Sequence, residues 1–139
     1  MDAQSAFDEP EQRVAFVDSS AIVSMVDRDD ANHPAAVEAY RDLLAQGYKL
    51  FTTNYVIIET YDLLSVGVGP GVARRWLREV KLPIYHVDEE EEQIARRMMT
   101  RGNGPHPLSL TDAISRVVMD RLGVTDVFAV DPNVLADNA

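Results

Sequence analysis

The sequence lacks cysteine, long apolar runs, internal repeats and low-complexity segments. Without cysteine, the chain can form no disulfide and has no thiolate to serve as a nucleophile or metal ligand. No apolar stretch approaches the roughly 18 residues that a membrane-spanning helix needs. The first twelve residues, MDAQSAFDEPEQ, lack the basic start and apolar core of a signal peptide. These absences predict a cytoplasmic protein with no membrane partner.

The net charge is −10, which on its own argues against a nucleic-acid partner, because phosphate contacts need lysine and arginine. Nine of the 23 acidic residues, however, lie either in the first twelve positions or in the acidic run 88–92. The other 14 nearly balance the 13 basic residues, so the overall charge excludes little. The run 88–92 is typical of a solvated helix start, which the helix dipole favours.

Segments with strand and helix patterns alternate along the chain. The alternation predicts an α/β fold with a mostly parallel central sheet. We expect one domain over residues 13–139 behind a flexible acidic tail, 1–12. Asn54 and His33 are expected to cap helices. Strands are predicted at 13–18, 48–52, 82–87 and 126–131, and helices at 20–27, 34–46, 54–66, 71–81, 88–101 and 110–122.

Two of the predicted strands end on an aspartate. The apolar run VAFV leads into Asp18, and VFAV leads into Asp131. Such runs are typical of central strands that are covered on both faces. In open parallel sheets, ligands bind outside the carboxyl ends of the strands. A single aspartate after a strand is usually a turn residue, but two at matching ends indicate a shared site.

Two further acids lie at unusual places on predicted helices. Glu59 has mostly apolar or aromatic neighbours one turn away, so it borders the buried face and needs a partner. Asp112 lies in the first turn of a helix that begins after Ser109. Each has an ordinary explanation, because Glu59 can reach solvent at the edge of the core, and Ser109 with Asp112 resembles a capping box.

Together, these four acids predict a divalent-cation site. Four carboxylates at one edge of a sheet repel one another, and a hard cation removes that repulsion. Mg²⁺ or Mn²⁺ prefers oxygen ligands and is often held by few carboxylates. Such a site can activate water and neutralise charge at a phosphate. The three histidines do not have the spacing of a zinc site.

The segments VDSSAIV, NYVIIETYDLL, LSLTDA and VFAVD, in this order, resemble the PIN-domain ribonucleases. The resemblance covers residues 13–135 and is greatest to the toxin component of VapBC-type toxin–antitoxin modules. It implies a PIN-like α/β/α sandwich and Mg²⁺- or Mn²⁺-dependent cleavage of RNA. Asp18, Glu59, Asp112 and Asp131 would act as metal ligands and catalytic residues. One departure follows Asp131, where this chain has Pro132 and not the basic or histidine residue that such toxins often have.

The resemblance also implies roles for neighbouring residues and for partners. Ser20 and Ser109 are expected to orient carboxylates or metal-bound water, and the candidate contacts to RNA are Arg116, Arg74 and Arg75. A cognate antitoxin and a homodimer are implied. We expect the antitoxin to present an arginine or lysine to Asp18, Glu59 or Asp112, with groove walls supplied by Ile22, Val26, Tyr40 and Leu44.

Three other functions remain open at this point. The chain could be a PIN-type RNA-processing nuclease without a toxin role, or a catalytically silent interaction module that keeps the fold. The presence of all four acids argues against the silent module. A phosphatase-like enzyme with an aspartyl nucleophile is a further alternative, but such enzymes usually have a second aspartate two positions after the first, where this chain has Ser20.

Overall fold

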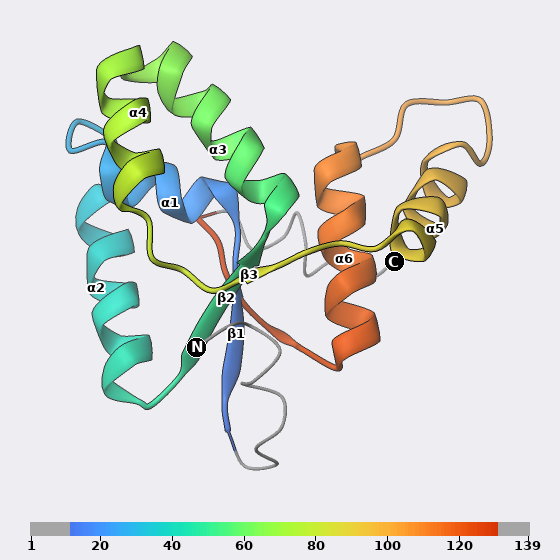
Figure 1. Ribbon diagram of the computed structural model, residues 1–139, viewed down its shortest axis with the longest axis horizontal. Coiled ribbons are helices and arrows are strands. Elements are labelled where there is room, and N and C mark those ends of the chain that lie inside the picture. The colour runs from blue at the N-terminus through green and yellow to red at the C-terminus, as the bar shows by residue number, and fades with distance from the viewer. Residues whose placement is uncertain (1–11, 131–139) are drawn as a thin grey trace.

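The computed structural model describes residues 12–130, which form an α/β fold with the predicted alternation (Figure 1). The strands are β1 (Val14–Val17), β2 (Lys49–Thr53), β3 (Ile84–Tyr85) and β4 (Asp126–Phe128). The helices are α1 (Ser19–Val26), α2 (His33–Ala45), α3 (Asn54–Gly67), α4 (Pro70–Glu79), α5 (Glu89–Met99) and α6 (Leu110–Leu122). No helix among these is long and apolar enough to cross a membrane. The predicted tail over residues 1–12 lies almost entirely outside the described residues.

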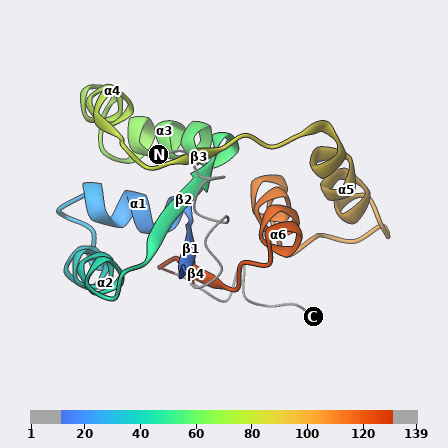
Figure 2. The same ribbon diagram turned by 60° about the horizontal axis from the view of Figure 1, so that its bottom comes forward.

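The four strands form one sheet in the order β3-β2-β1-β4, and every pair is parallel. Helices α1 to α4 lie on one side of the sheet, and α5 and α6 lie on the other (Figures 1 and 2). This arrangement confirms the predicted α/β/α fold with a mostly parallel sheet. Because β1 and β2 are central, their carboxyl ends and the helices that follow them meet at one edge of the sheet.

The core lies around β1 and β2. Phe16 and Phe51 are almost fully buried, and their rings meet edge to face with centroids 5.6 Å apart. Apolar side chains of α1, α3 and α6 complete this core from both sides, including Ile22, Val56 and Val118. The sheet is therefore covered on both faces, which explains why its central strands consist of continuous apolar runs.

Two predicted caps differ from the structure. The cap of α3 is Thr53, whose hydroxyl accepts a hydrogen bond from the Val56 N–H at 3.2 Å. Asn54 is instead the first helical residue, and its side-chain oxygen accepts a hydrogen bond from the Val87 N–H at 3.0 Å. His33 is not a cap either, because Asn32 precedes the helix and the His33 ring contacts the Ser24 carbonyl oxygen at 2.8 Å.

The prediction that the run 88–92 is solvated is wrong for Glu91. Asp88 and Glu91 form a capping box at the start of α5, and the Glu91 side chain is fully buried. Its carboxylate also accepts a hydrogen bond from the Tyr85 hydroxyl at 2.8 Å and lies 3.4 Å from the Arg121 guanidinium. Burial, followed by this hydrogen bond, raises the pKa of Tyr85 to about 12. Glu91 thus joins β3, α5 and α6.

Candidate active site

Asp18 lies at the carboxyl end of the central strand β1 and begins helix α1. Its N–H donates to the Phe128 carbonyl at 3.0 Å, so β4 fixes the backbone at this point. The Asp18 side chain is 5% exposed. Its Oδ2 accepts hydrogen bonds from the Ser20 hydroxyl at 2.9 Å and from the Ser20 N–H at 3.5 Å. Its Oδ1 is buried and has no hydrogen-bond partner among residues 12–130.

Ser20 connects Asp18 to the chain that follows β4. Its hydroxyl donates to Asp18 and accepts a hydrogen bond from the Val130 N–H at 3.1 Å. Val130 directly precedes Asp131, the fourth predicted acid, which lies outside the described residues. The single Ser20 hydroxyl therefore holds the Asp18 carboxylate and the last described residue of the chain in one arrangement.

Glu59 extends from α3 toward the start of α1, where it has the partner that its position requires. The Ser19 hydroxyl donates to the Glu59 Oε1 at 2.6 Å. Ser19 is buried, and its contact with Glu59 did not enter the sequence prediction. The pair of serines after Asp18 was the available signal. Adjacent side chains on a helix point in different directions, so Ser20 contacts Asp18 while Ser19 contacts Glu59.

Asp112 lies in the first turn of α6. Its N–H donates to the Ser109 hydroxyl at 3.1 Å, so Ser109 caps this helix as expected. Burial is the largest influence on the Asp112 carboxyl group and raises its pKa. Hydrogen bonding from Ser109 opposes this shift, and the negative charge of Glu59 adds to it. Asp112 and Glu59 are therefore near enough for their charges to interact.

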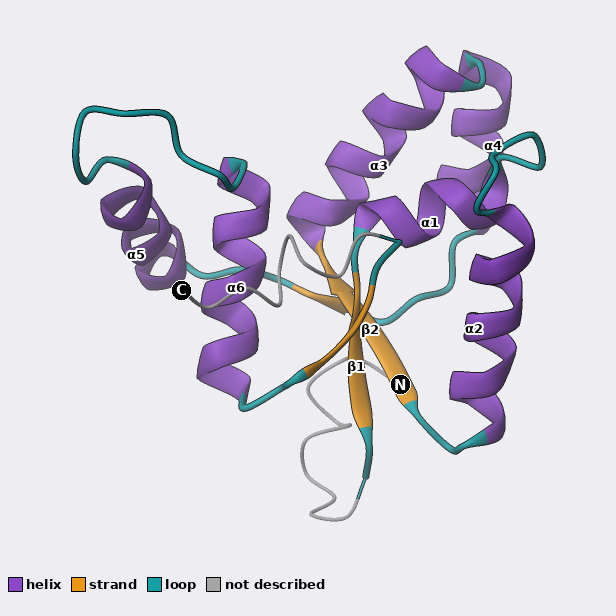
Figure 3. Ribbon diagram, turned by 180° about the vertical axis from the view of Figure 1, so that it is seen from behind, coloured by secondary structure: helices purple, strands orange, loops and turns teal. Residues whose placement is uncertain are grey.

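The three described acids share one electrostatic environment. Burial is the largest cause that raises the pKa of Asp18, the Ser20 hydroxyl opposes it, and the charge of Asp112 adds to it. The charge of Glu59 acts in turn on Asp112. Three acids from β1, α3 and α6, far apart in sequence, are thus brought to the same edge of the sheet. At this edge the amino-terminal ends of α1, α3 and α6 approach one another (Figure 3).

The carboxylates do not form a closed ligand set in this structure. Within residues 12–130, no three acidic or histidine side chains are grouped tightly enough to hold a metal ion. Ser19 and Ser20 hold Glu59 and Asp18 in separate hydrogen bonds, and like charges keep acids apart. The donor chemistry nevertheless fits a hard divalent cation, because the ligands available are carboxylate and hydroxyl oxygens and one buried carboxylate oxygen, Asp18 Oδ1, is unpartnered.

The three predicted RNA contacts are not brought together. Arg116 is half-buried on α6, one turn after Asp112, and is therefore near the acids. Arg74 and Arg75 are exposed on α4, and α3 lies between α4 and α6 in all three views (Figures 1 to 3). Arg75 is also within 3.7 Å of Glu79 in an exposed ion pair. The structure thus separates Arg74 and Arg75 from the acids.

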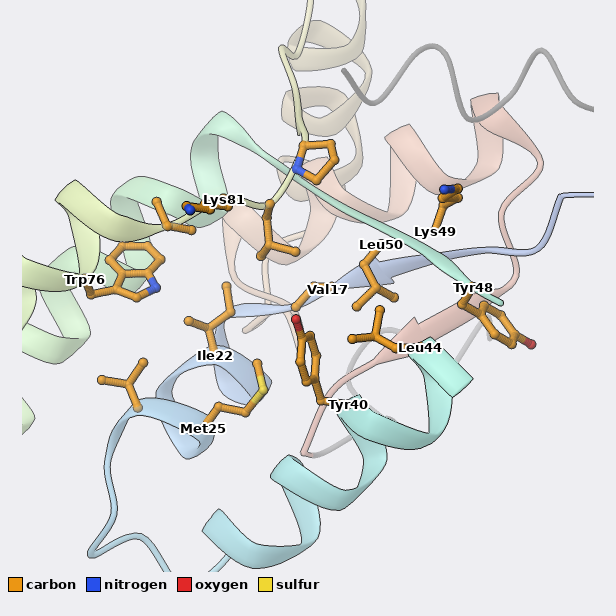
Figure 4. Close-up of a pocket in the computed structure, with 14 residues that line it drawn as sticks. Val17, Ile22, Met25, Tyr40, Leu44, Tyr48, Lys49, Leu50, Trp76 and Lys81 are labelled. Atoms are coloured by element: carbon orange, nitrogen blue, oxygen red, sulfur yellow. The ribbon is translucent and has the colours of Figure 1, made fainter. Parts of the chain in front are cut away.

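The four apolar residues that were predicted to form a groove wall line one groove. Ile22 and Val26 of α1, with Tyr40 and Leu44 of α2, face a cavity of about 560 Å³ (Figure 4). None of the three described acids lines this cavity. The groove and the acidic site are therefore separate surfaces, connected through the residues of α1.

The chain belongs to the PIN domain family, whose model matches residues 15–137. Among solved structures, it is similar to the toxin VapC20 of Mycobacterium tuberculosis, which is described as a toxin that cleaves the sarcin–ricin loop. The two share 28% sequence identity with a TM-score of 0.72, over 88% of this chain and 93% of the other. The comparison with curated proteins found no match. The resemblance to PIN-domain proteins and VapC-type toxins, predicted from four short segments, is confirmed.

Proposed function

We propose that this protein is a metal-dependent endoribonuclease that hydrolyses phosphodiester bonds at Asp18, Glu59, Asp112 and Asp131, and that it is the toxin of a toxin–antitoxin pair. The observation that supports this proposal most strongly is that Asp112 lies within electrostatic reach of both Asp18 and Glu59, beside a buried carboxylate oxygen of Asp18 that has no hydrogen-bond partner among residues 12–130. The similarity to a toxin that cleaves RNA supports the substrate class. A cytoplasmic location is part of the same proposal.

Mg²⁺ or Mn²⁺ fits the donors of this site, with Asp18 and Asp112 as the main ligands and Glu59 and Asp131 completing the set. When bound, such an ion supplies an activated water and neutralises the charge that develops on the phosphate. A cation also removes the mutual repulsion of carboxylates whose pKa values are raised by burial and by one another. Because the ion relieves this repulsion, the grouping of the acids strengthens the binding of the ion.

The residues around the acids position them. Ser20 donates to one oxygen of Asp18 and leaves the other oxygen free to act as a ligand. Ser19 holds Glu59, and Ser109 fixes the start of the helix that carries Asp112. Hydrogen-bonding partners of this kind typically change metal affinity or activity by about 10- to 100-fold when they are removed.

The substrate in this proposal is RNA held beside the acids by a small number of basic groups. Arg116 is the best-placed phosphate contact, because it lies on the same helix as Asp112, one turn further on. Arg74 and Arg75 would contact only an RNA that extends past α3. The weak basic character near the acids favours a structured RNA that is recognised by shape over a long, purely electrostatic contact.

The toxin role implies an antitoxin and a dimer. We propose that a segment of the antitoxin presents an arginine or lysine to Asp18, Glu59 or Asp112 and so replaces the charge of the metal. Inhibition would then weaken at high salt and compete with Mn²⁺. A homodimer is proposed on the same grounds, and α3 carries exposed apolar side chains, Ile58 and Val66, that a second copy would cover.

The test of this function is cleavage of a mixed RNA pool with Mg²⁺, Mn²⁺ or a chelator, by the wild-type chain and by Asp112→Asn. Ser109 caps α6 and accepts the Asp112 backbone N–H, so this variant keeps the cap and the size of the side chain but loses a charged ligand. We expect metal-dependent cleavage by the wild type and none by the variant. Full activity in Asp112→Asn would show that the Asp112 carboxylate is not needed for catalysis.

Two alternatives make different predictions in the same experiments. A catalytically silent interaction module would cleave no RNA with either metal. An RNA-processing nuclease would cleave RNA, but its expression in a host cell would not arrest growth. We expect the wild-type chain to arrest growth, Asp112→Asn not to do so, and co-expression of the proposed antitoxin to relieve the arrest.

A further inference from the structure

Tyr55 lies on the first turn of α3, one turn before Glu59 and therefore on the same face of the helix. Its side chain is half-buried and packs against the small apolar cluster between α5 and α6, which consists of Ala95, Ala113, Ile114 and Val117. Ala113 directly follows the acid Asp112 in the chain. Tyr55 therefore links the acids of the site to the surface where α5 meets α6, with part of its side chain open to solvent.

Two charged side chains of α5 lie beside the Tyr55 hydroxyl. Hydrogen bonding with the Glu92 carboxylate is the largest cause that raises the pKa of Tyr55, and the positive charge of Arg96 acts against it. Glu92 and Arg96 are one turn apart on α5, but among residues 12–130 Arg96 forms no ion pair. The Arg96 side chain is exposed. Its guanidinium group therefore keeps donors that a phosphate can occupy.

The position of Arg96 distinguishes it from the next arginine of the same helix. Arg97 is also exposed, but adjacent side chains on a helix point about 100° apart. The charge of Arg96 acts on Tyr55, whereas that of Arg97 does not. Arg96 is thus the arginine of α5 that lies beside an aromatic ring and near the acids.

An aromatic ring beside an arginine is typical of sites that hold single-stranded RNA. Unpaired bases stack on tyrosine rings, and arginine binds the adjoining phosphate. Stacking on a ring needs no net positive charge. It therefore suits a chain with a net charge of −10 whose candidate site is formed by acids.

We propose that Tyr55 and Arg96 form a nucleotide-binding subsite beside the acids, in which the base of an unpaired RNA nucleotide stacks on the Tyr55 ring and its phosphate binds the Arg96 guanidinium. The subsite holds the RNA strand on the α5 side of the site, so that a neighbouring phosphodiester lies at the acids. The inference rests on the proposed RNA substrate and adds a requirement for an unpaired nucleotide next to the cleaved bond. Neither side chain takes part in breaking that bond.

The stacking contact is tested with a pool of short single-stranded RNAs of random sequence. Binding is measured in the full chain carrying Asp112→Asn, in which we expect the RNA to stay intact. Tyr55→Phe keeps the ring and should bind RNA as tightly as the parent, whereas Tyr55→Leu should bind about fivefold or more weakly, because it loses one base–aromatic stack. Tyr61→Leu is the control, because Tyr61 is also a half-buried tyrosine of α3. Equal affinities of Tyr55→Leu and Tyr61→Leu would overturn the stacking contact.

A second measurement needs no substitution at position 55. Ultraviolet irradiation of the RNA complex joins stacked bases to aromatic side chains, and mass spectrometry of the digested complex identifies the attached residue. We expect RNA to be attached to Tyr55 and not to Tyr61. Attachment at other residues only would overturn the stacking contact, even if Tyr55→Leu fails to fold, which circular dichroism establishes.

Arg96→Gln and Arg97→Gln together test the phosphate contact, because each removes one positive charge from an exposed position of α5. Arg96→Gln should weaken binding and reduce the slope of log K against log salt concentration by about 0.7, which corresponds to one phosphate of a single strand. In the chain with Asp112 intact, it should raise KM and leave kcat unchanged. Arg97→Gln should change neither the slope nor KM. Equal effects of the two variants would overturn the Arg96 contact.

The outcome is separable from that of the proposed function. If the wild type cleaves RNA, and Tyr55→Leu and Arg96→Gln cleave it with unchanged KM, the subsite is refuted and the nuclease function stands. If RNA binds at Tyr55 and Arg96 but is not cleaved by the wild type with either metal, the nuclease function is refuted and the subsite stands. A chain that binds none of the RNA pool would refute the subsite.

Discussion

Replacing Ser20 by alanine should weaken both the fold and the metal site, because one hydroxyl serves both. This hydroxyl donates to the buried Asp18 carboxylate at 2.9 Å and accepts the Val130 N–H at 3.1 Å. In Ser20→Ala, residue 20 can donate to Asp18 only through its backbone N–H, which lies 3.5 Å from the carboxylate. The Val130 N–H loses the hydroxyl that accepts its hydrogen bond. Because the hydroxyl lowers the pKa of Asp18 against the effect of burial, its loss should raise that pKa further.

The expected size follows from these contacts. A hydrogen bond to a charged group contributes about 1.5–3 kcal/mol to stability, and a neutral one about 1 kcal/mol. Allowing for relaxation, we expect the metal-free variant to lose about 2–3 kcal/mol. For a chain of this size, each kcal/mol corresponds to roughly 3–5 °C in melting temperature, so the decrease should be roughly 6–15 °C.

The metal response should change as well. Loss of a group that orients a ligand typically lowers metal affinity by about 10- to 100-fold. When Mn²⁺ is well above its Kd, such a change removes about 1.4–2.7 kcal/mol of the stabilisation that the ion provides. The assay is thermal unfolding with and without Mn²⁺ for the wild type, Ser20→Ala and Ser24→Ala. Ser24 is the control, because it is buried one turn further along α1 and makes no hydrogen bond to Asp18 or Glu59.

An increase in melting temperature with Mn²⁺ that is the same in Ser20→Ala and the wild type would refute this reasoning. So would an equal loss of stability in Ser20→Ala and Ser24→Ala without metal, since burial alone would then account for it.

Three further predictions concern charge. Without metal, Asp112→Asn should be neutral or stabilising, measured by chemical denaturation, because it removes one charge from a crowded group. The pKa values of Asp18 and Asp112 are raised in the folded state. The contribution of these groups to the free energy of unfolding is therefore complete below pH 3.8, and it is lost as the pH rises through the pKa values of the folded state. Denaturation of the metal-free chain across pH should show this loss, and either asparagine variant should reduce it. Glu91→Ala should cost about 2–4 kcal/mol in thermal unfolding, because it leaves the Tyr85 hydroxyl and the Asp88 N–H without their acceptor and removes one of the two carboxylates near Arg121.

The sequence predicted the architecture well because its local signals agreed with one another. Apolar runs, helix periodicity and turn residues all indicated alternating strands and helices, and the structure has these elements in this order. Strand ends were less accurate. The predicted strand 82–87 is paired only over Ile84–Tyr85, because an edge strand beside β2 is held from one side, and Pro83 contributes no N–H to the pairing.

The candidate site was predictable where a residue conflicted with its surroundings. Glu59 borders the core of α3, and a carboxylate in such a place needs a partner, which the structure provides as Ser19. The identity of that partner could not be predicted, because it depends on how α1 and α3 cross. The same limit applies to Glu91. Its buried carboxylate contacts Tyr85 of β3 and Arg121 of α6, and the sequence does not show that these elements meet.

The placement of the basic residues also required the structure. Arg74 and Arg116 both lie on predicted helices, and nothing in their local sequence distinguishes one from the other. Only the position of α3 between α4 and α6 separates Arg74 from the acids. The concentration of both lysines at one groove is likewise a property of the fold, because Lys49 begins β2 and Lys81 follows α4.

The most direct test of the central claim is single-turnover cleavage of RNA by the wild type and Asp18→Asn across a range of Mn²⁺ concentrations. Asparagine preserves the size of the side chain and can still cap α1. The variant therefore removes the charge of Asp18, the most buried of the three described acids of the site, without removing its shape. We expect the wild-type rate to rise with Mn²⁺ to a plateau and the variant rate to be at least 100-fold lower throughout. Cleavage by Asp18→Asn at the wild-type rate, or wild-type cleavage that persists undiminished in a chelator, would contradict the account.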